Sequence, residues 1–300
     1  MSDNNSDREV RWERMFPHQL EVAFGACPGL YFPYGLCEPH GPQNALGLDG
    51  LKAHGILVRL AREHGGIVAP PDFWHIHEIG GYASWAYDSV GEVKPWMSAV
   101  PPWHHFKSIC YHIRAAEVLD FQAAILLTGH YGPNWKDLKS LVDLIQPWVR
   151  VRLYGLPDFE ANEPGFPNDG AGGDHAGKVE TSLLWALEPD CVEVDRIPDD
   201  PQFPLFAMGK NAAESRLEAG KKMVADEVAW LANKRDELLD AYDPGHPSRL
   251  RTYGDVERFW NAEVEPLIQE FETMRQWRPE REPPPERSRW RENWPVDRGT

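Results

Sequence analysis

A short stretch of the chain, residues 34–49, carries two acids and an imidazole at spacings that suit metal binding. Glu38 and His40 are two residues apart, so on an extended backbone both side chains point the same way. Asp49 follows a loop rich in Gly and Pro and opens a helical pattern over 51–63. Because Glu, His and Asp are suitable ligands for divalent cations, the stretch indicates a metal site. Taken singly, Asp49 also fits a helix N-cap, and Glu38 and His40 fit ordinary loop residues.

Two later segments place similar residues after elements that we expect to be buried. The apolar run 123–127 is typical of a buried strand, and Gly-His-Tyr-Gly-Pro-Asn follows it at 129–134. The segment 173–182 reads Gly-Asp-His-Ala-Gly-Lys-Val-Glu-Thr-Ser and leads into an apolar helical pattern. In open parallel sheets, ligands bind at the carboxyl ends of the strands, so these segments are expected to meet there.

The three motifs together resemble the creatininase (creatinine amidohydrolase) family. They are Glu-Xaa-His-Gly-Pro with a downstream Asp, Gly-His with an Asn, and His-Ala-Gly-Xaa-Xaa-Glu-Thr-Ser, and they span roughly residues 15–235. The resemblance implies an enzyme, a metal-dependent hydrolase with two divalent metal ions. It also implies a homo-oligomer, which in this family is often a hexamer. The ligand types suit Zn, Mn or Fe.

The resemblance also assigns roles to individual residues. The implied metal ligands are Glu38, His40, Asp49, His130 and Glu180. Asp49 would be shared between the two ions, with Glu38 and His130 on one and His40 on the other. Creatininase has a Glu two residues after the His of the second motif, where this chain has Gly132. We therefore predict that Glu180 replaces it, although Glu180 also fits an acid placed favourably in the first turn of a helix.

The third motif supplies the expected proton-transfer group. His175 would carry a proton to the leaving nitrogen, because imidazole titrates near neutral pH, and Asp174 would orient it. The helix start expected at Ala176 would add partial positive charge for an oxyanion. The expected substrate contacts are Tyr131, Trp103, Trp135 and His77. His77 lies in the segment 72–105, which is rich in Trp and His and lacks the Pro-Gly-Thr turn common in the family.

The resemblance leaves the substrate open. The first hypothesis is opening of a C–N bond in a small cyclic amide or formamide by a metal-activated hydroxide. The alternative is a ring-opening C–C hydrolase acting on a cyclic keto-sugar such as 3-dehydro-scyllo-inosose. A third hypothesis is a noncatalytic binding protein on the same scaffold, since fold alone does not establish function.

The elements that must position these residues alternate between strand and helix patterns. A short helix is expected over 12–20, limited by Pro17, and a first strand within the apolar run 20–32. Further strands are expected at 67–69, 123–128 and 149–153, and helices at 51–63, 106–119, 135–148 and 209–240. An alternation of strands and helices joined by short loops predicts a three-layer α/β/α sandwich with a mostly parallel central sheet.

Three regions are expected along the chain. Residues 1–10 are polar and expected to be disordered, 11–240 form the hydrolase domain, and 241–300 form a helical and then Pro- and Trp-rich extension. Trp290 and Trp294 in that extension suggest an arm that packs on the domain or on a neighbouring subunit. The 4 cysteines have no spacing typical of a zinc site or a disulfide framework.

The composition limits the classes of partner that the protein is expected to bind. A formal net charge of −16 argues against nucleic acid or an anionic membrane, and a small molecule is the expected partner. The sequence shows no apolar signal core and no long apolar run, so the expectation is a soluble, cytoplasmic protein.

Overall fold

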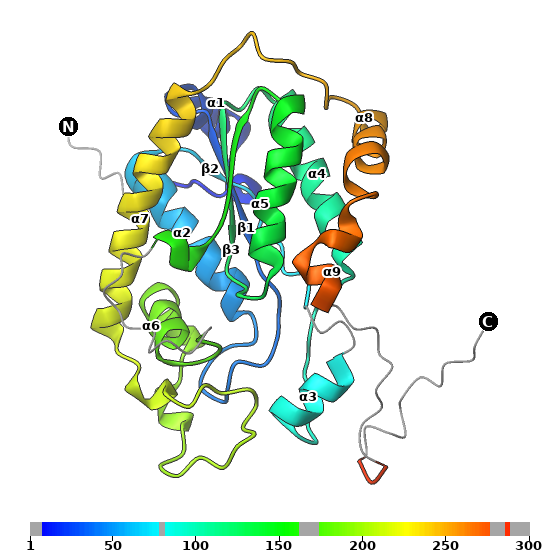
Figure 1. Cartoon of the computed structure of the whole chain (residues 1–300). Coiled ribbons are helices and arrows are strands. Elements are labelled where there is room, and N and C mark those ends of the chain that lie inside the picture. The colour runs from blue at the N-terminus through cyan, green and yellow to red at the C-terminus, as the bar shows by residue number, and fades with distance from the viewer. Residues whose placement is uncertain (1–7, 78–81, 162–173, 277–285, 289–300) are drawn as a thin grey trace, which may run out of the picture.

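A parallel four-stranded sheet lies at the centre of the computed structural model, which describes residues 8–77, 82–161, 174–276 and 286–288. The strands are β1 (Gly29–Tyr34), β2 (Ile67–Val68), β3 (Ala123–Thr128) and β4 (Arg152–Pro157). Their order in the sheet is β2-β1-β3-β4, and every pair is parallel. Figure 1 shows this sheet between the helices that follow its strands.

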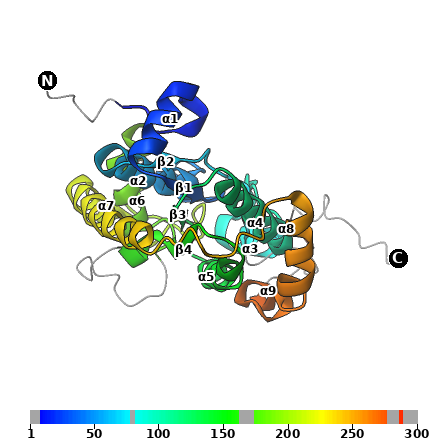
Figure 2. The ribbon, with the colours of Figure 1, turned by 90° about the horizontal axis from the view of Figure 1, so that it is seen from above.

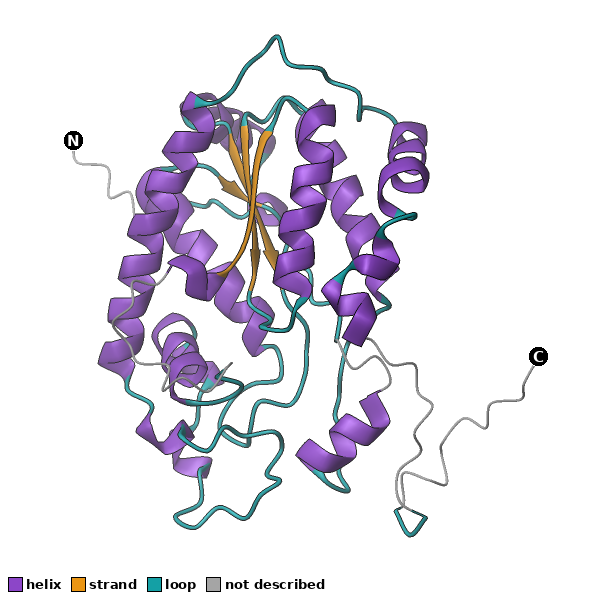
Figure 3. Cartoon of the chain, in the orientation of Figure 1, coloured by secondary structure: helices purple, strands orange, loops and turns teal. Residues whose placement is uncertain are grey.

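Helices cover both faces of the sheet. The described helices are α1 (Pro17–Ala26), α2 (Leu48–His64), α3 (Tyr82–Val90), α4 (Pro102–Val118), α5 (Asn134–Ile145), α6 (Lys178–Leu187), α7 (Leu217–Asp240), α8 (Tyr253–Phe259) and α9 (Glu272–Gln276), of which α3 and α6 lie beyond the carboxyl end of the sheet. Alternate strand residues point to opposite sides, so Phe32 and Leu126 pack with α4, α5 and α8, whereas Tyr31 and Ile125 pack with α2 and α7. Figures 2 and 3 show the layers, which confirm the predicted α/β/α sandwich.

The first predicted strand was wrong over its first half. Residues 17–26 form α1, in which Pro17 takes the first helical position because its missing N–H is not needed there. Val22, expected to be buried, is 69% exposed. The apolar run therefore contains two elements, a surface helix and then β1, and Cys27 and Pro28 separate them.

Other predicted boundaries also moved. The strand expected at 149–153 lies at 152–157, and the helix expected from 209 begins at Leu217. The segment 72–105 contains a helix, α3, that its irregular pattern did not predict. The disorder expected over 1–10 is wrong for its last residues, because Val68 donates a backbone hydrogen bond to the Val10 carbonyl. Residues 1–7 lie outside the described part of the chain.

The extension after residue 240 packs on its own domain as far as it is described. Leu250, Phe259 and Phe271 join the same apolar cluster as α4 and α5. Trp290 and Trp294, expected to form an arm, lie outside the described residues. No helix in the described ranges combines the length and apolar character of a membrane span.

Two glycines let the first turn of α2 approach the carboxyl ends of the strands. A Cβ at Gly35, directly after β1, would lie 2.2 Å from the Gly50 nitrogen. A Cβ at Gly129, directly after β3, would lie 2.1 Å from the Asp49 carbonyl oxygen. Any side chain at either position would push α2 away, so these glycines bring Asp49 between the two strand ends.

Candidate metal centre

The five residues expected to bind metal converge at the carboxyl end of the sheet, and all are buried. They are Glu38 and His40 after β1, Asp49 in the first turn of α2, His130 after β3, and Glu180 in the first turn of α6. The Nδ1 of His130 lies 3.0 Å from Glu38 Oε1 and 3.2 Å from Asp49 Oδ2. The Nε2 of His40 lies 3.2 Å from Asp49 Oδ1 and 3.8 Å from Glu180 Oε2.

These residues form two groups of candidate metal ligands that share Asp49, and a third candidate group joins Glu38 and His40 to His175. The ligand atoms of Glu38, Asp49 and His130 lie within 4.8 Å of one another, and so do those of His40, Asp49 and Glu180. Asp49 turns Oδ2 toward the first group and Oδ1 toward the second. A carboxylate shared in this way suits two cations, which in two-metal hydrolases lie about 3.5–4 Å apart.

The polar atoms at this site fit bound cations. Among the described residues, both oxygens of Glu38, Oδ1 of Asp49 and Nε2 of His40 are buried without a hydrogen bond of good geometry. Buried polar atoms are normally satisfied, so such a group needs a further partner. His40 Nδ1 lies 3.0 Å from the Glu38 carbonyl oxygen, to which it donates. That bond directs Nε2 toward the carboxylates, as metal-binding histidines require.

The acids and imidazoles hold one another in charged forms. Burial alone would raise the pKa of Asp49, but His40 and His130 lower it well below its usual value. Burial likewise opposes the charge on His40, but Asp49, Glu38 and Glu180 raise its pKa to about 9. The metal-free site therefore keeps Asp49 ionised and a proton on His40 at neutral pH.

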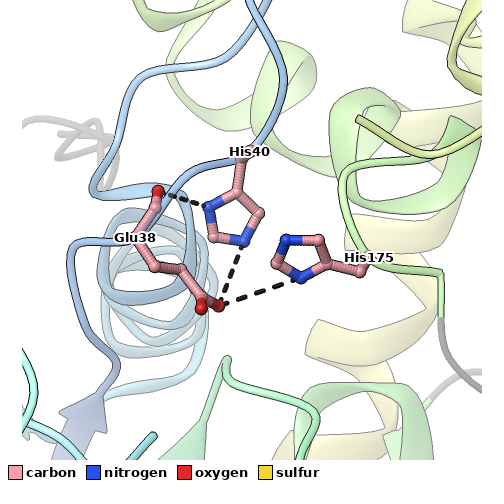
Figure 4. A group of neighbouring side chains, drawn as sticks. All are labelled: Glu38, His40 and His175. Carbon is pink, nitrogen blue, oxygen red and sulfur yellow. Dashed lines mark hydrogen bonds and ion pairs between the residues drawn. The ribbon is translucent and has the colours of Figure 1, made fainter. Parts of the chain in front are cut away.

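His175 lies beside the two groups, with its ring stacked on that of His40 at a centroid distance of 4.5 Å (Figure 4). Its Nε2 lies 2.9 Å from the Pro39 carbonyl oxygen, which can only accept, so Nε2 carries the hydrogen in the neutral ring. Nδ1 then faces the site, 3.8 Å from Glu38 Oε1. The side chain is 37% exposed and borders a cavity, so it can exchange protons with a bound molecule.

A cavity of about 700 Å³ opens above the ligands. Its described lining includes Tyr131, His77 and a wall formed by 203–205 and 207–210. Backbone hydrogen bonds join that wall to two site segments, from Gly41 N to Phe206 O at 2.6 Å and from Gly209 N to Ala176 O at 3.1 Å. Sequence reasoning missed this wall because it carries only loop signals and no motif.

Asp174 and Ala176 have other roles than those expected. Asp174 Oδ2 accepts the backbone N–H groups of Val179 and Glu180, so it caps α6, and the Pro39 carbonyl orients His175 instead. Helix α6 begins at Lys178, and the Ala176 N–H donates to Glu180 Oε2 at 2.8 Å. The helix start expected at Ala176 is therefore wrong by two residues, and the Ala176 N–H is occupied by Glu180.

The four expected substrate contacts divide into two pairs. Tyr131 and His77 border the metal cavity, and His77 Nε2 lies 3.4 Å from Glu38 Oε2. Trp103 instead borders a separate cavity beside Trp260, and Trp135 packs edge-on against the Phe159 ring. Neither tryptophan is among the described residues that line the cavity above the candidate ligands, so the structure does not place them as the expected substrate contacts.

Sequence reasoning also missed two buried charges, Lys52 and Asp158. Lys52 Nζ lies 2.9 Å from Glu180 Oε1 and 3.0 Å from Asp158 Oδ2. The available signal was the spacing of three between Asp49 and Lys52, which places both on one side of α2. Asp158 follows β4 directly, a position that predicts the same end of the sheet.

Comparisons with known proteins agree with this geometry. The sequence profile described as "Creatininase: Creatinine amidohydrolase" matches residues 13–234. A creatinine amidohydrolase from Pseudomonas putida is 27% identical over 217 residues, which cover 66% of this chain and 78% of that protein.

Solved structures share the fold. A crystal structure of creatinine amidohydrolase aligns with a TM-score of 0.63 at 19% identity, covering 77% of this chain and 98% of that one. A creatininase structure with Mn aligns with a TM-score of 0.61 at 21% identity, covering 77% and 99%. With the profile match over most of its length, this chain belongs to the creatininase family and is a metal-dependent hydrolase of the amidohydrolase type.

Proposed function

We propose that this chain is a two-metal hydrolase that opens a C–N bond in a small cyclic amide or formamide. The observation that carries the proposal is the pair of ligand groups sharing Asp49 at a cavity that His175 also borders. Similar solved structures include a creatininase of Zn-Zn type and one complexed with creatine, which supports two cations and a small substrate. Zn, Mn and Fe all suit these ligands.

The metal ions and the chain have separate tasks. When bound, the two cations lower the pKa of a water molecule and polarise the substrate carbonyl. The five ligands fix where the water and the carbonyl meet. The cavity wall at 203–210 restricts access of bulk water and positions the substrate.

His175 is the proposed proton carrier. The hydrogen bond from Nε2 to Pro39 leaves Nδ1 to accept a proton from the attacking water and return it to the leaving nitrogen. The net reaction consumes one water, forms a C–O bond at the carbonyl carbon and breaks the C–N bond. The nitrogen leaves with the added proton.

The cavity lining favours a small molecule with one apolar face. Phe203, Leu205 and Met208 offer apolar surface, whereas the ligand residues supply the polar surface. Asp88, Ser89 and Lys210 also border the cavity and could bind hydroxyl groups. Because these polar residues suit a hydroxylated substrate, a ring-opening C–C hydrolase acting on a cyclic keto-sugar is the second candidate function.

The test loads the purified chain with Zn²⁺, Mn²⁺ or Fe²⁺ and offers cyclic amides, N-formyl amides and a cyclic keto-sugar. Mass spectrometry of products would show hydrolysis of an amide, abolished by chelation. Hydrolysis of the keto-sugar alone would favour the second candidate. Two bound ions with no turnover on the panel would favour a noncatalytic binding protein. Native mass spectrometry would test the proposed homo-oligomer.

A further inference from the structure

Lys52 is a lysine with no exposed side-chain surface, on α2 one turn after the shared ligand Asp49. Lysine is almost never fully buried unless its charge is paired. Neither the three motifs nor the five ligands account for it. Because Lys52 lies beside the second ligand group, we looked for a function of this residue at that group.

The ammonium group of Lys52 has a partner for each of its three N–H bonds. Nζ lies 2.9 Å from Glu180 Oε1, 3.0 Å from Asp158 Oδ2, and 3.8 Å from the centre of the Tyr131 ring. A cation over an aromatic face is an attractive arrangement. Burial opposes the charge, but Asp158 and Glu180 raise the pKa of Lys52 above its ordinary value. The two carboxylates and the aromatic ring therefore hold the Lys52 ammonium in one place.

The partner Glu180 is held at both oxygens. Oε1 accepts from Lys52, and Oε2 accepts the Ala176 N–H at 2.8 Å while lying 3.8 Å from His40 Nε2. The Glu180 backbone is held as well, because its N–H donates to Asp174. With Oε1 taken by Lys52, Oε2 is the oxygen presented to the second ligand group.

The second ligand group has one carboxylate of its own, Glu180, as the first has Glu38. Its only carboxylates in the described chain are Glu180 and the shared Asp49. Gly132 stands where creatininase has a Glu, so that position supplies no side chain. Glu180 reaches this group from α6, so the contacts of its carboxylate decide whether Oε2 lies beside His40.

Resting on the two-metal function proposed above, we propose that Lys52 is a positioning residue that holds Glu180 as a ligand of the second cation. The ammonium fixes one carboxylate oxygen so that the other faces His40 and Asp49. Asp158 fixes the ammonium in turn, and Tyr131 covers it from the cavity side. Residues that hold a ligand in this way commonly change metal affinity by about 10–100-fold when they are replaced.

Charge and geometry have opposite effects here, so the test must separate them. A nearby ammonium repels a metal ion, and its removal would strengthen metal binding if charge alone mattered. The double variant Lys52→Met/Asp158→Asn removes one positive and one negative charge, which leaves the local net charge unchanged. A change in its metal affinity then reports the position of Glu180. Asp158→Asn alone is the matched control, because it keeps the ammonium on Glu180.

The experiment counts Mn²⁺ ions per chain by elemental analysis and measures both dissociation constants by chelator competition. Circular dichroism checks the fold of each variant. We expect two ions in the wild type and in Asp158→Asn, and one in Glu180→Gln. In the double variant we expect an unchanged first site and a second site weakened about tenfold or more.

The outcomes distinguish this proposal from the function on which it rests. Two ions at wild-type affinity in the double variant, with the second lost in Glu180→Gln, would overturn the role of Lys52 alone. Fewer than two ions in the wild type would overturn both proposals. If the double variant does not fold, a crystal structure of the Mn²⁺-loaded wild type decides. Glu180 bound to Lys52 through Oε1 and to metal through Oε2 supports the proposal, and a Glu180 turned away from Lys52 overturns it.

Discussion

The two ends of the sheet bury carboxylates in opposite ways. At the amino end, Glu117 accepts the backbone N–H groups of Arg150 and Val151, the Arg150 guanidinium and the Ser248 hydroxyl. At the carboxyl end, Glu38 is just as buried, yet its oxygens have no hydrogen bond of good geometry among the described residues. Imidazole nitrogens surround it instead.

The difference shows that burial of an acid does not by itself mark a functional site. Glu117 accepts hydrogen bonds from donors of the chain itself, so this acid has a structural role and links α4 to the segment before β4. It leaves Glu38, Asp49 and His40 with atoms that converge on common points, which is the arrangement a cation needs. The predictions below test this contrast, beginning with the largest expected effect.

Asp49→Asn should have the largest effect, because both ligand groups share this carboxylate. We expect loss of both metal ions and a fall in activity of about 10³-fold or more. Elemental analysis and turnover of the identified substrate measure the two effects. Retention of two ions with full activity would show that Asp49 does not bridge.

His175→Asn should lower kcat by about 10²–10⁴-fold while leaving the metal content unchanged, because His175 is proposed to carry protons rather than bind metal. The pH dependence of kcat should also change. A variant that loses metal to the same extent as activity would place His175 among the ligands instead.

Lys52→Met should lower the free energy of unfolding of the metal-free chain by about 3–5 kcal/mol, since it leaves Asp158 and Glu180 buried without their cation. Chemical denaturation followed by circular dichroism measures this loss. An unchanged stability would mean that the two acids find other partners or protons at little cost.

Glu117→Gln should lower the free energy of unfolding by about 1.5–3 kcal/mol through its weakened hydrogen bonds. Metal content and kcat should stay at wild-type values, because Glu117 lies at the amino end of the sheet. A loss of metal in the folded variant would mean that the two ends are not independent.

Metal affinity should depend on pH through His40. The metal-free chain holds its pKa at about 9, so binding below that pH must displace a proton. Apparent affinity should therefore rise as pH increases from 7 toward 9, by up to about tenfold per unit, and level off above 9. Calorimetry in buffers of different ionisation enthalpy measures the released proton. An affinity that is constant over this range would contradict the assignment.

The sequence predicted the sheet, and the meeting of the candidate ligands at its carboxyl end, for a physical reason, whereas the ligand set itself came from the family resemblance. Buried strands such as 123–128 leave apolar runs, and the residues after parallel strands meet at one edge, which placed Glu38 and His130 together. The first strand failed because α1 is itself apolar enough to merge with β1. Its Val22 is exposed, which periodicity alone did not reveal.

Contacts between distant segments could not be predicted from local patterns. Lys52 resembles any helix lysine until Asp158 and Glu180 are seen beside it. Asp174 resembled a partner of its neighbour His175, whereas its side chain turns to the start of α6. For Trp103 and Trp135, the sequence indicated a residue type that suits a pocket wall but not the direction in which each side chain points.

One measurement addresses the metal centre most directly. Crystals of the Mn²⁺-loaded chain, measured at the manganese absorption edge, would locate each ion by anomalous scattering. We expect two peaks about 3.5–4 Å apart with Asp49 between them, one beside Glu38 and His130 and the other beside His40 and Glu180. The absence of a peak between Asp49 and His130 would contradict the account.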